Sequence, residues 1–292
     1  MKAYKGFNHD LTCRGFQYEI GKDYEENRAE LCESGFHACE MPLDVFRYYG
    51  PVDDNAQLNR FCVVELDDVV DGERDDSKIC GRKIHVEEEI GLSGLADAQI
   101  RYIAERADKS NANCNSGDQS VASNSGNQSV ASTSGYYSVA SNSGDRSVAS
   151  NSGNRSVASN SGNRSVASNS GDDSVASNSG YMSVASNSGD RSVASNSGNR
   201  SVASNSGDYS VASNSGDDSV AEVTGKNGVA VGWGRNNQCK GSLGCYLVLS
   251  EWGEWDGEEY HLLNAKIVKV DGESIKADTH YALENGEIIE IQ

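Results

Sequence analysis

The most regular pattern of apolar and polar residues lies in the middle of the chain, where a Val-Ala pair recurs every nine residues. Twelve units of the form Gly-x-x-Ser-Val-Ala-Ser-Asn-Ser begin between Gly117 and Gly216. Ser, Val and Ala at the fourth to sixth places do not change, whereas the Asn of the eighth place is replaced at Thr133. This strict phase indicates that the fixed places have the same packed neighbours in every unit, which a flexible Gly/Ser linker would not require.

A strand of Ser-Val-Ala-Ser closed by an Asn-Ser-Gly turn fits nine residues, with Gly and Asn supplying the positive φ angles of the turn. Two units would form one coil, and successive coils would pair backbone to backbone about 4.8 Å apart. We expect Val to face inward, because it is the only sizeable apolar side chain of the unit. Ser and Asn would form ladders with like residues in adjacent coils. The pattern therefore predicts a mainly β fold, a nonapeptide-repeat β-solenoid with about 18 residues per coil.

The flanking segments show different patterns. The N-terminal part contains the strand-like runs YKGF, GFQYEI, FCVVEL and IHVEEEI, and CESGFHACEMPLDVFRYY is typical of a turn that leads into a short helix. GLADAQIRYIAERA has helical spacing, and a helix there could cover the first coil, whose open edge would otherwise pair with another chain. CYLVLSEW, AKIVKV and EIIEIQ read as strands joined by hairpin turns. The predicted organisation is an α+β N-terminal module at 1–93, a capping helix at 94–110, the solenoid at 111–234 and a β-rich C-terminal module at 235–292.

Charge and composition exclude several classes of protein. The chain has 292 residues with 44 acidic and 25 basic side chains, a formal net charge of -19. A strongly acidic chain is a poor direct nucleic-acid binder, and the absence of a run of about 18 apolar residues argues against a membrane helix. No apolar core typical of a secretion signal follows the N-terminus. Residues 111–220 carry only 8 acidic and 5 basic groups, which weakens the idea that the solenoid imitates DNA by continuous negative charge.

The second and third places of the repeat vary and are the candidate partner-binding positions. If alternate units share an edge, one edge carries most of the Arg residues and the other most of the Tyr residues. Tyr and Arg are enriched at interface hot spots, although such turn residues could equally serve only solubility. The candidate partner-binding residues are Tyr136, Tyr137, Arg146, Arg155, Arg164, Asp172, Asp173, Tyr181, Arg191, Arg200, Tyr209, Asp217 and Asp218.

The two ends of the chain resemble modules found in phage and prophage proteins. The resemblance rests on KGFNHDLTCRGFQYEIGKDYE with CESGFHACEMPLDVFRYY at the N-terminus, and on GCYLVLSEW, KIVKVDG and GEIIEI at the C-terminus. It implies a bacterial-virus origin and the cytoplasm of a bacterial host, and it implies no activity. The repeats resemble the β-solenoid repeats of YadA-like adhesin heads, which have a longer period. The nine-residue period also resembles the RTX calcium repeat, but the Asp and the extra Gly of that repeat are missing here.

Chemistry in the N-terminal module is the less favoured alternative. Cys13, Cys32, His37 and Cys39 are weak zinc-ligand candidates, because their spacing matches no standard finger or ribbon. The simpler interpretation is small core cysteines in a reducing compartment. His37 with Glu40, or His85 with the glutamates that follow it, could form an acid–base pair, but no known catalytic motif is present.

The sequence thus predicts a non-enzymatic phage or prophage interaction protein without cofactors. Its most specific form is an inhibitor of a host defence protein that binds through a rigid solenoid surface, with nucleic-acid mimicry as one mode. The partner would be a host protein and not nucleic acid or a membrane, and the chain could also form homo-oligomers. A virion-associated spacer or adhesin-like fibre, and an enzyme in the N-terminal module with the solenoid as scaffold, are the alternatives.

Overall fold

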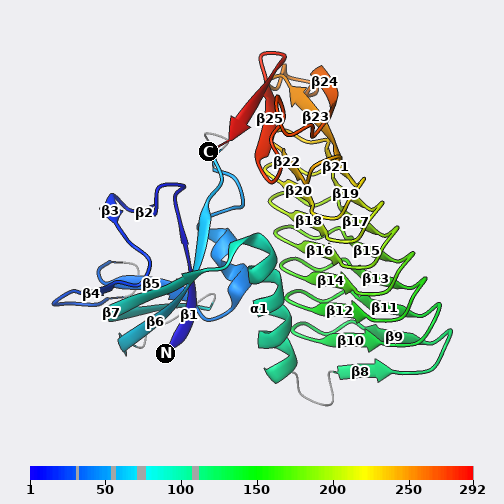
Figure 1. The fold of residues 1–292 in the computed structure, drawn as a ribbon. Helices are drawn as coiled ribbons and strands as arrows, with labels where there is room; N and C mark the ends of the chain where they lie inside the picture. Colours follow the sequence, from blue (N-terminus) through cyan, green and yellow to red (C-terminus); the bar gives the residue numbers. More distant parts are fainter. Residues whose placement is uncertain (31–32, 54–56, 71–76, 107–111, 292) are drawn as a thin grey trace. The chain divides into compact units, whose positions relative to one another are not determined.

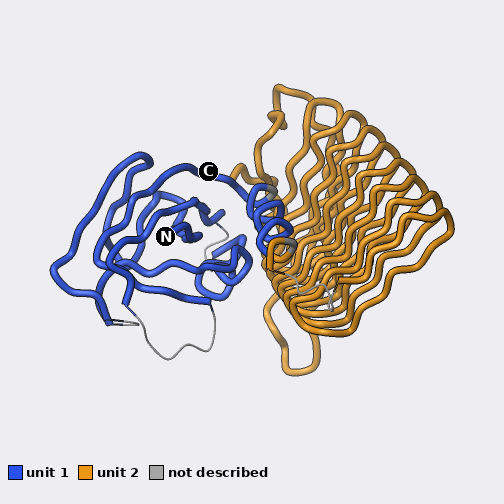
Figure 2. The backbone as a smooth tube through the Cα atoms, turned by 90° about the horizontal axis from the view of Figure 1, so that it is seen from below, with its two compact units in different colours: residues 1–102 blue, residues 103–292 orange. Residues whose placement is uncertain are grey.

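The computed structural model describes all residues except 31–32, 54–56, 71–76, 107–111 and 292. The chain divides into two compact units, residues 1–102 and residues 103–292 (Figure 2). The first unit is small and irregular, and the second contains the repeats.

The N-terminal unit is built on a small barrel-like sheet. The strands β7 (Lys78–Glu89), β5 (Phe36–Cys39), β1 (Lys2–Phe7) and β6 (Arg60–Val70) pair antiparallel in this order. β6 also pairs with β7, which closes the ring. A short strand β4 (Asp23–Glu25) adds to β7. The predicted strands at YKGF, FCVVEL and IHVEEEI are confirmed, but GFQYEI contributes only β3 (Phe16–Gln17), which forms a hairpin with β2 (Thr12–Cys13).

Because side chains alternate along a strand, every second side chain of these strands faces the interior of the barrel. Phe7, Phe36, Val64, Ile79 and Ile84 are buried in one cluster. The expected turn into a short helix is present, since a 3₁₀ helix η1 (Pro42–Arg47) follows β5 and begins with proline, whose fixed φ suits a first helical turn.

The repeats form a β-solenoid, as the nine-residue period predicts (Figure 1). Each unit supplies one four-residue strand, and alternate units stack in two parallel sheets. Pairing is in register with a shift of 18 residues, so that Val148 lies opposite Val166 and Ala149 opposite Ala167. One stack contains β8 (Ala112–Asn115), β10 (Val130–Thr133), β12 (Val148–Asn151), β14 (Val166–Asn169), β16 (Val184–Asn187), β18 (Val202–Asn205), β20 (Val220–Val223) and β22 (Gln238–Gly241). The other contains β9 (Val121–Asn124), β11 (Val139–Asn142), β13 (Val157–Asn160), β15 (Val175–Asn178), β17 (Val193–Asn196), β19 (Val211–Asn214), β21 (Val229–Gly232) and β23 (Tyr246–Trp252).

The expectation that Val faces inward is wrong. The alanine of each unit is fully buried, from Ala122 to Ala230, and these alanines form one continuous core cluster. Because side chains alternate across a strand, Asn shares the inner side with Ala, whereas Val and the following Ser face away. The small alanine methyl allows the two sheets to approach closely, which the larger Val would prevent.

The role of the repeat glycine also differs from the expectation. Positive φ belongs to the third residue of each unit, a non-glycine residue such as Tyr137 or Arg155, with φ of 55° and 54°. The glycine is required because the coils approach at this point: a Cβ on Gly171 would lie 2.2 Å from the carbonyl oxygen of Gly153. Only glycine can occupy that position without displacing a coil.

Polar ladders complete the interior. The fourth-place serines are buried and stack on one another, with the Ser165 N–H donating to the hydroxyl of Ser183 at 3.2 Å. The buried Asn side chains do not bond to like residues as expected. Instead they donate across the turn to a Val carbonyl of the next strand, as Asn205 Nδ2 does to Val211 at 2.9 Å. This bond joins each strand to the next one along the chain, across the turn between the two sheets.

The C-terminal segment continues the solenoid and then closes it. β22 and β23 extend the parallel stacks beyond residue 234. The three last strands run antiparallel: β24 (Leu262–Lys269) covers β23, and β25 (His280–Glu284) covers β22 and forms a hairpin with β26 (Glu287–Ile291). The core widens here, because Leu247, Leu249 and Tyr281 replace the alanines.

A helix, α1 (Gly91–Arg106), follows β7 in the chain and begins earlier than expected; residues 107–110 of the predicted helix lie outside the described residues. Its apolar residues Leu95 and Ile103 are buried. The proposed capping of the first coil by this helix stays a prediction. Among the described residues, no helix has the length and apolar character needed to span a bilayer.

Candidate functional site

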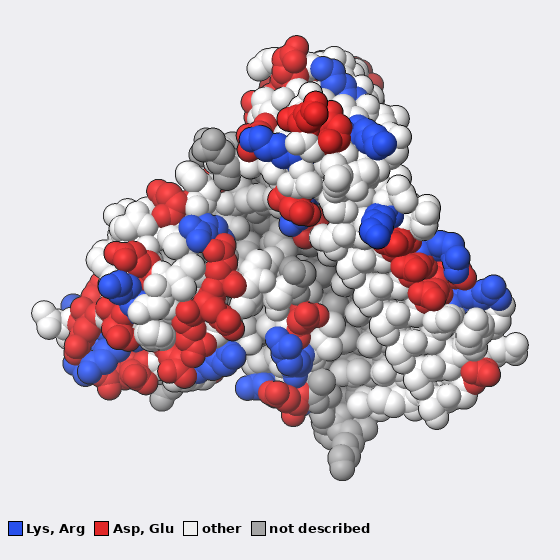
Figure 3. Space-filling model, in the orientation of Figure 1, with Lys and Arg blue, Asp and Glu red and all other residues white. Residues whose placement is uncertain are grey.

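The variable turns form two rows, as expected from alternate units sharing an edge. The turns that precede β11, β13, β15, β17 and β19 form one row, which we call the Tyr137 edge. The turns that precede β12, β14, β16, β18 and β20 form the other, the Arg146 edge. Figure 3 shows charged side chains gathered along the turns, while most of the surface between them is uncharged.

Third-place residues on the Tyr137 edge make a continuous row of contacts. Arg155 donates to the Tyr137 hydroxyl at 2.6 Å and its guanidinium lies 5.6 Å from that ring. Asp173 lies between two arginines, 3.6 Å from Arg155 and 2.8 Å from Arg191. The hydrogen bond from Arg191, aided by Arg155, lowers the pKa of Asp173. Tyr209 ends the row and is 65% exposed.

Second-place residues have a structural role that the sequence did not reveal. The Asp172 carboxylate accepts the backbone N–H of Asp190 in the next coil at 2.9 Å, and Asp217 accepts that of Arg235 at 2.9 Å. Asn residues at the same place do likewise, as Asn163 does for Tyr181. The preference for Asp or Asn at this place therefore reflects the stacking of turns, and Tyr136 and Tyr181 depart from it.

The Arg146 edge is less uniform. Met182 is buried, Arg146 and Arg164 are half-buried, and Tyr181 is exposed. Arg200 lies 6.0 Å from the Tyr181 ring and 3.8 Å from Asp218. The structure thus divides the predicted partner-binding residues between two edges. Among the described residues the longer row of contacts lies on the Tyr137 edge, where it runs from Tyr137 through Arg155 and Asp173 to Arg191.

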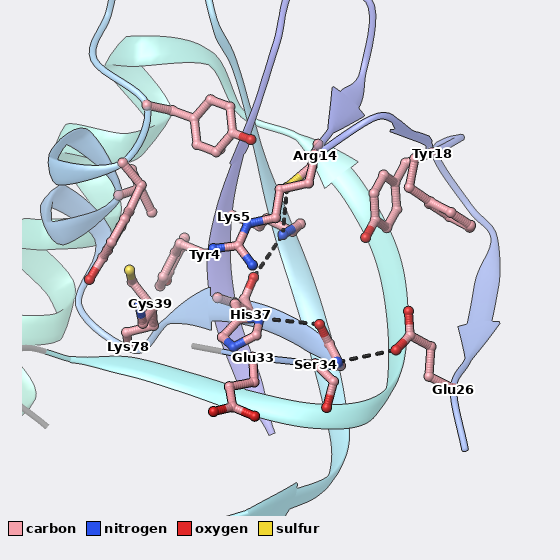
Figure 4. A pocket seen from close by; sticks show the side chains of 18 residues that line it. Tyr4, Lys5, Arg14, Tyr18, Glu26, Glu33, Ser34, His37, Cys39 and Lys78 are labelled. Carbon is pink, nitrogen blue, oxygen red and sulfur yellow. Dashed lines mark hydrogen bonds between the residues drawn. The ribbon is translucent and has the colours of Figure 1, made fainter. Parts of the chain in front are cut away.

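A second candidate site is a cavity of about 530 Å³ in the N-terminal unit. Its wall contains Lys5 from β1, Arg14 from the β2–β3 turn, His37 from β5 and several aromatic rings (Figure 4). Lys5 is only 6% exposed. Its ammonium group donates to the carbonyl of His37 at 2.8 Å and to the Cys13 sulfur at 3.5 Å.

The pKa shifts of the titratable groups in the cavity are caused mainly by burial and by nearby cations. Burial lowers the pKa of Lys5 and, together with the cations Lys5, Lys78 and Arg14, lowers the pKa of His37 to about 4. Burial also raises the pKa of the Tyr18 phenol. His37 and Tyr18 are therefore neutral at pH 7.

The weak zinc candidates come together only in part. Cys13, His37 and Cys39 line this cavity, whereas Cys32 lies outside the described residues. The described part of the chain holds no cluster of three or more His, Cys, Asp or Glu side chains with metal-binding geometry. His85 contacts Asp23 at 2.8 Å on the barrel surface rather than the glutamates that follow it.

Sequence reasoning missed Lys5 and Arg14. Lys5 stands in the middle of an otherwise apolar strand, YKGF, which is a signal for an inward-facing charge. Arg14 and Gly15 form the two-residue turn of the β2–β3 hairpin with φ of 52° and 78°. Asn or Gly usually occupies the first of these positions, so an arginine there is unusual.

Comparison with known proteins adds one finding. Residues 1–98 match the family model described as a domain of unknown function, DUF7666. No curated protein and no solved structure gives a significant match. The matched segment contains the whole of the cavity wall, and the repeats lie outside it.

Proposed function

We propose that the protein is a non-enzymatic interaction protein of a phage or prophage that binds a host protein through the Tyr137 edge of its solenoid. The observation that carries this proposal is the row of third-place side chains from Tyr137 to Tyr209, of which the first four are in contact. Five successive coils present Tyr, Arg, Asp, Arg and Tyr at identical backbone positions. A stacked β backbone holds these side chains at fixed spacing, which reduces the entropy lost on binding.

The chemistry of the row favours a protein partner. Tyrosine and arginine provide large contact areas and hydrogen bonds, and they dominate hot spots of protein interfaces. Asp173 is flanked by two arginines, so the row offers no continuous negative charge. Mimicry of nucleic acid is therefore the less supported mode, and inhibition by occupying a partner's protein-binding surface is the better supported one.

The test removes the row without disturbing the turns. Because the third places have positive φ, asparagine is the suitable replacement, since it tolerates the left-handed region. A variant with Tyr137→Asn, Arg155→Asn, Arg191→Asn and Tyr209→Asn should keep the circular dichroism spectrum of the wild type. It should lose capture of a stoichiometric partner from a bacterial lysate by roughly tenfold or more, measured by quantitative mass spectrometry.

The matched variant changes the other edge, with Arg200→Asn and Asp218→Asn, and should retain capture. Equal capture by wild type and both variants would contradict the proposal. Co-purification with virus particles and not with a host protein would favour the structural alternative of a spacer or fibre. The inhibitory role is tested by virus plating on defence-carrying bacteria that express the wild type or the Tyr137-edge variant, with restored plating expected only for the wild type.

A further inference from the structure

The strongest unexplained feature of the molecule is a pair of cations without a carboxylate partner in the N-terminal cavity. Lys5 is buried, and Arg14 extends across the cavity beside it (Figure 4). Among the described residues, no carboxylate forms an ion pair with either side chain, and burial lowers the pKa of Lys5 more than the Cys13 and Cys39 thiols raise it. A buried charge without a counter-ion is costly, so this arrangement is typical of a site that receives an anion.

The carboxylates near the cavity do not neutralise this pair. Glu26 and Glu33 line the wall, but among the described residues neither forms an ion pair with Lys5 or Arg14, and Glu26 accepts the backbone N–H of Gly35 at 3.1 Å. The hydrogen-bond partners of Lys5 are the sulfur of Cys13 and the carbonyl of His37. The site is cationic within a chain whose formal net charge is -19, so the positive sign is local and cannot come from the overall composition.

The rest of the wall is aromatic. Phe16, Tyr18, Tyr48 and Tyr49 line the cavity, and Tyr18 packs edge-on against Phe16 with ring centroids 4.9 Å apart. Faces of aromatic rings bind planar heterocycles by stacking. A cavity of about 530 Å³ lies in the range of sites for small organic ligands and is larger than phosphate alone needs.

We propose that this cavity binds a nucleoside phosphate, with the phosphate between Lys5 and Arg14 and the base against the tyrosine-rich wall. The arginine provides two parallel donors that match phosphate oxygens, and the lysine provides a third. The His37 imidazole lines the same cavity and can report on a bound anion. The proposal is independent of the solenoid edges, because every residue involved belongs to residues 1–102.

The test measures binding of AMP, GMP, CMP and UMP to the full-length protein by isothermal titration calorimetry, beside adenosine and ribose 5-phosphate. At least one nucleotide should bind roughly tenfold more tightly than its nucleoside and than ribose 5-phosphate, because charged hydrogen bonds and stacking each contribute at least this much. The absence of saturable binding for all four nucleotides overturns the proposal. Equal affinity for ribose 5-phosphate also overturns it, because the aromatic wall would then have no role.

Two variants test the residues. Arg14→Gln and Lys5→Met should each weaken the affinity roughly tenfold or more, whereas Lys2→Met, an exposed lysine of the same strand, should leave it unchanged. Lys5→Met should not lower the melting temperature of the free protein, because it removes an unpaired buried charge. Unchanged affinity in both cavity variants overturns the assignment.

An independent readout comes from His37. The free imidazole has a pKa of about 4 because burial and the cations Lys5, Lys78 and Arg14 oppose its protonation. A bound phosphate dianion should raise this pKa by about one unit or more. The shift is visible in the pH titration of the imidazole resonances by NMR, and an unshifted titration under nucleotide saturation counts against binding at this place.

Discussion

The solenoid and the N-terminal barrel differ in how their buried polar side chains find hydrogen-bond partners. In the solenoid each side chain lies on a copy of itself 18 residues away, so buried serines bond to serines and each turn carboxylate or amide bonds to the next turn. In the barrel each side chain has its own set of neighbours, which is not repeated elsewhere in the unit. Lys5 is buried beside Arg14, and its hydrogen-bond partners are a thiol sulfur and a backbone carbonyl.

This difference teaches where a specific small-ligand site can arise. Repetition gives every fixed polar group the same surroundings in each coil, so that the fourth-place serines bond to one another, and it leaves only the variable turn places available to a partner. An irregular barrel can hold an uncompensated charge, because no repeat rule completes its surroundings. We therefore assign an extended protein-binding surface to the solenoid and a ligand cavity to the barrel.

The largest expected effect concerns the close approach of coils. Gly171→Ala should lower the free energy of unfolding by about 3 kcal/mol, because its Cβ would lie 2.2 Å from the Gly153 carbonyl oxygen. Gly117→Ala in the first coil is the matched control, since the nearest atom to its Cβ is 3.9 Å away. Urea denaturation followed by circular dichroism should show a change within about 0.5 kcal/mol for the control. Equal losses in both variants would contradict the close-approach argument.

A buried ion cluster lies where the repeat ends. Glu222 stands where earlier units have Ser and lies 2.8 Å from Lys240 and 3.2 Å from His280. Hydrogen bonds and charges from these two residues outweigh burial and hold the pKa of Glu222 at about 2. Glu222→Gln should cost about 2 kcal/mol at pH 7, whereas Glu290→Gln, which breaks only the exposed pair with Lys276, should cost less than about 1 kcal/mol.

The pH dependence of the same cluster follows from the sign of the shift. The folded-state pKa of Glu222 lies below the ordinary value of 4.5, so its contribution is present above that value and is lost as pH falls toward about 2. The wild type should therefore lose stability over this interval more steeply than Glu222→Gln. Parallel urea midpoints of the two proteins from pH 5 to about pH 2 would contradict the role of the cluster.

The sequence predicted the solenoid because the strict period requires identical environments, and it predicted the two edges for the same reason. The sequence did not predict which side chain faces the interior of the solenoid. The larger apolar side chain of Val suggested Val, whereas the close spacing of the two sheets selects Ala. The N-terminal cavity could not be predicted from local pattern. Lys5, Arg14 and His37 are separated in the chain, and only the pairing of β1 with β5 and the tight β2–β3 hairpin bring them together.

A moderate effect is expected at the second place of the turns. Asp172→Ala removes the acceptor for the Asp190 N–H and should lower the free energy of unfolding by about 1 kcal/mol. Asp172→Asn keeps an acceptor oxygen, as Asn163 shows for Tyr181, and should be neutral within about 0.3 kcal/mol. Urea midpoints of the two variants check this prediction. Equal destabilisation by both would mean that the charge, and not the hydrogen bond, stabilises the turn.

The smallest effect is expected at Thr133, which stands at the eighth place where most units have Asn. Thr133 is buried at an Asn place, and its hydroxyl has no hydrogen-bond partner among the described residues. Thr133→Asn would restore the amide that donates to the Val carbonyl six residues later, as Asn142 does to Val148 at 2.6 Å. The variant should gain about 0.5 kcal/mol in urea denaturation, while Ser134→Asn at the exposed neighbouring place should gain nothing. A loss of stability on Thr133→Asn would show that the eighth place is selected by volume, and that the amide hydrogen bond does not stabilise the turn between β10 and β11.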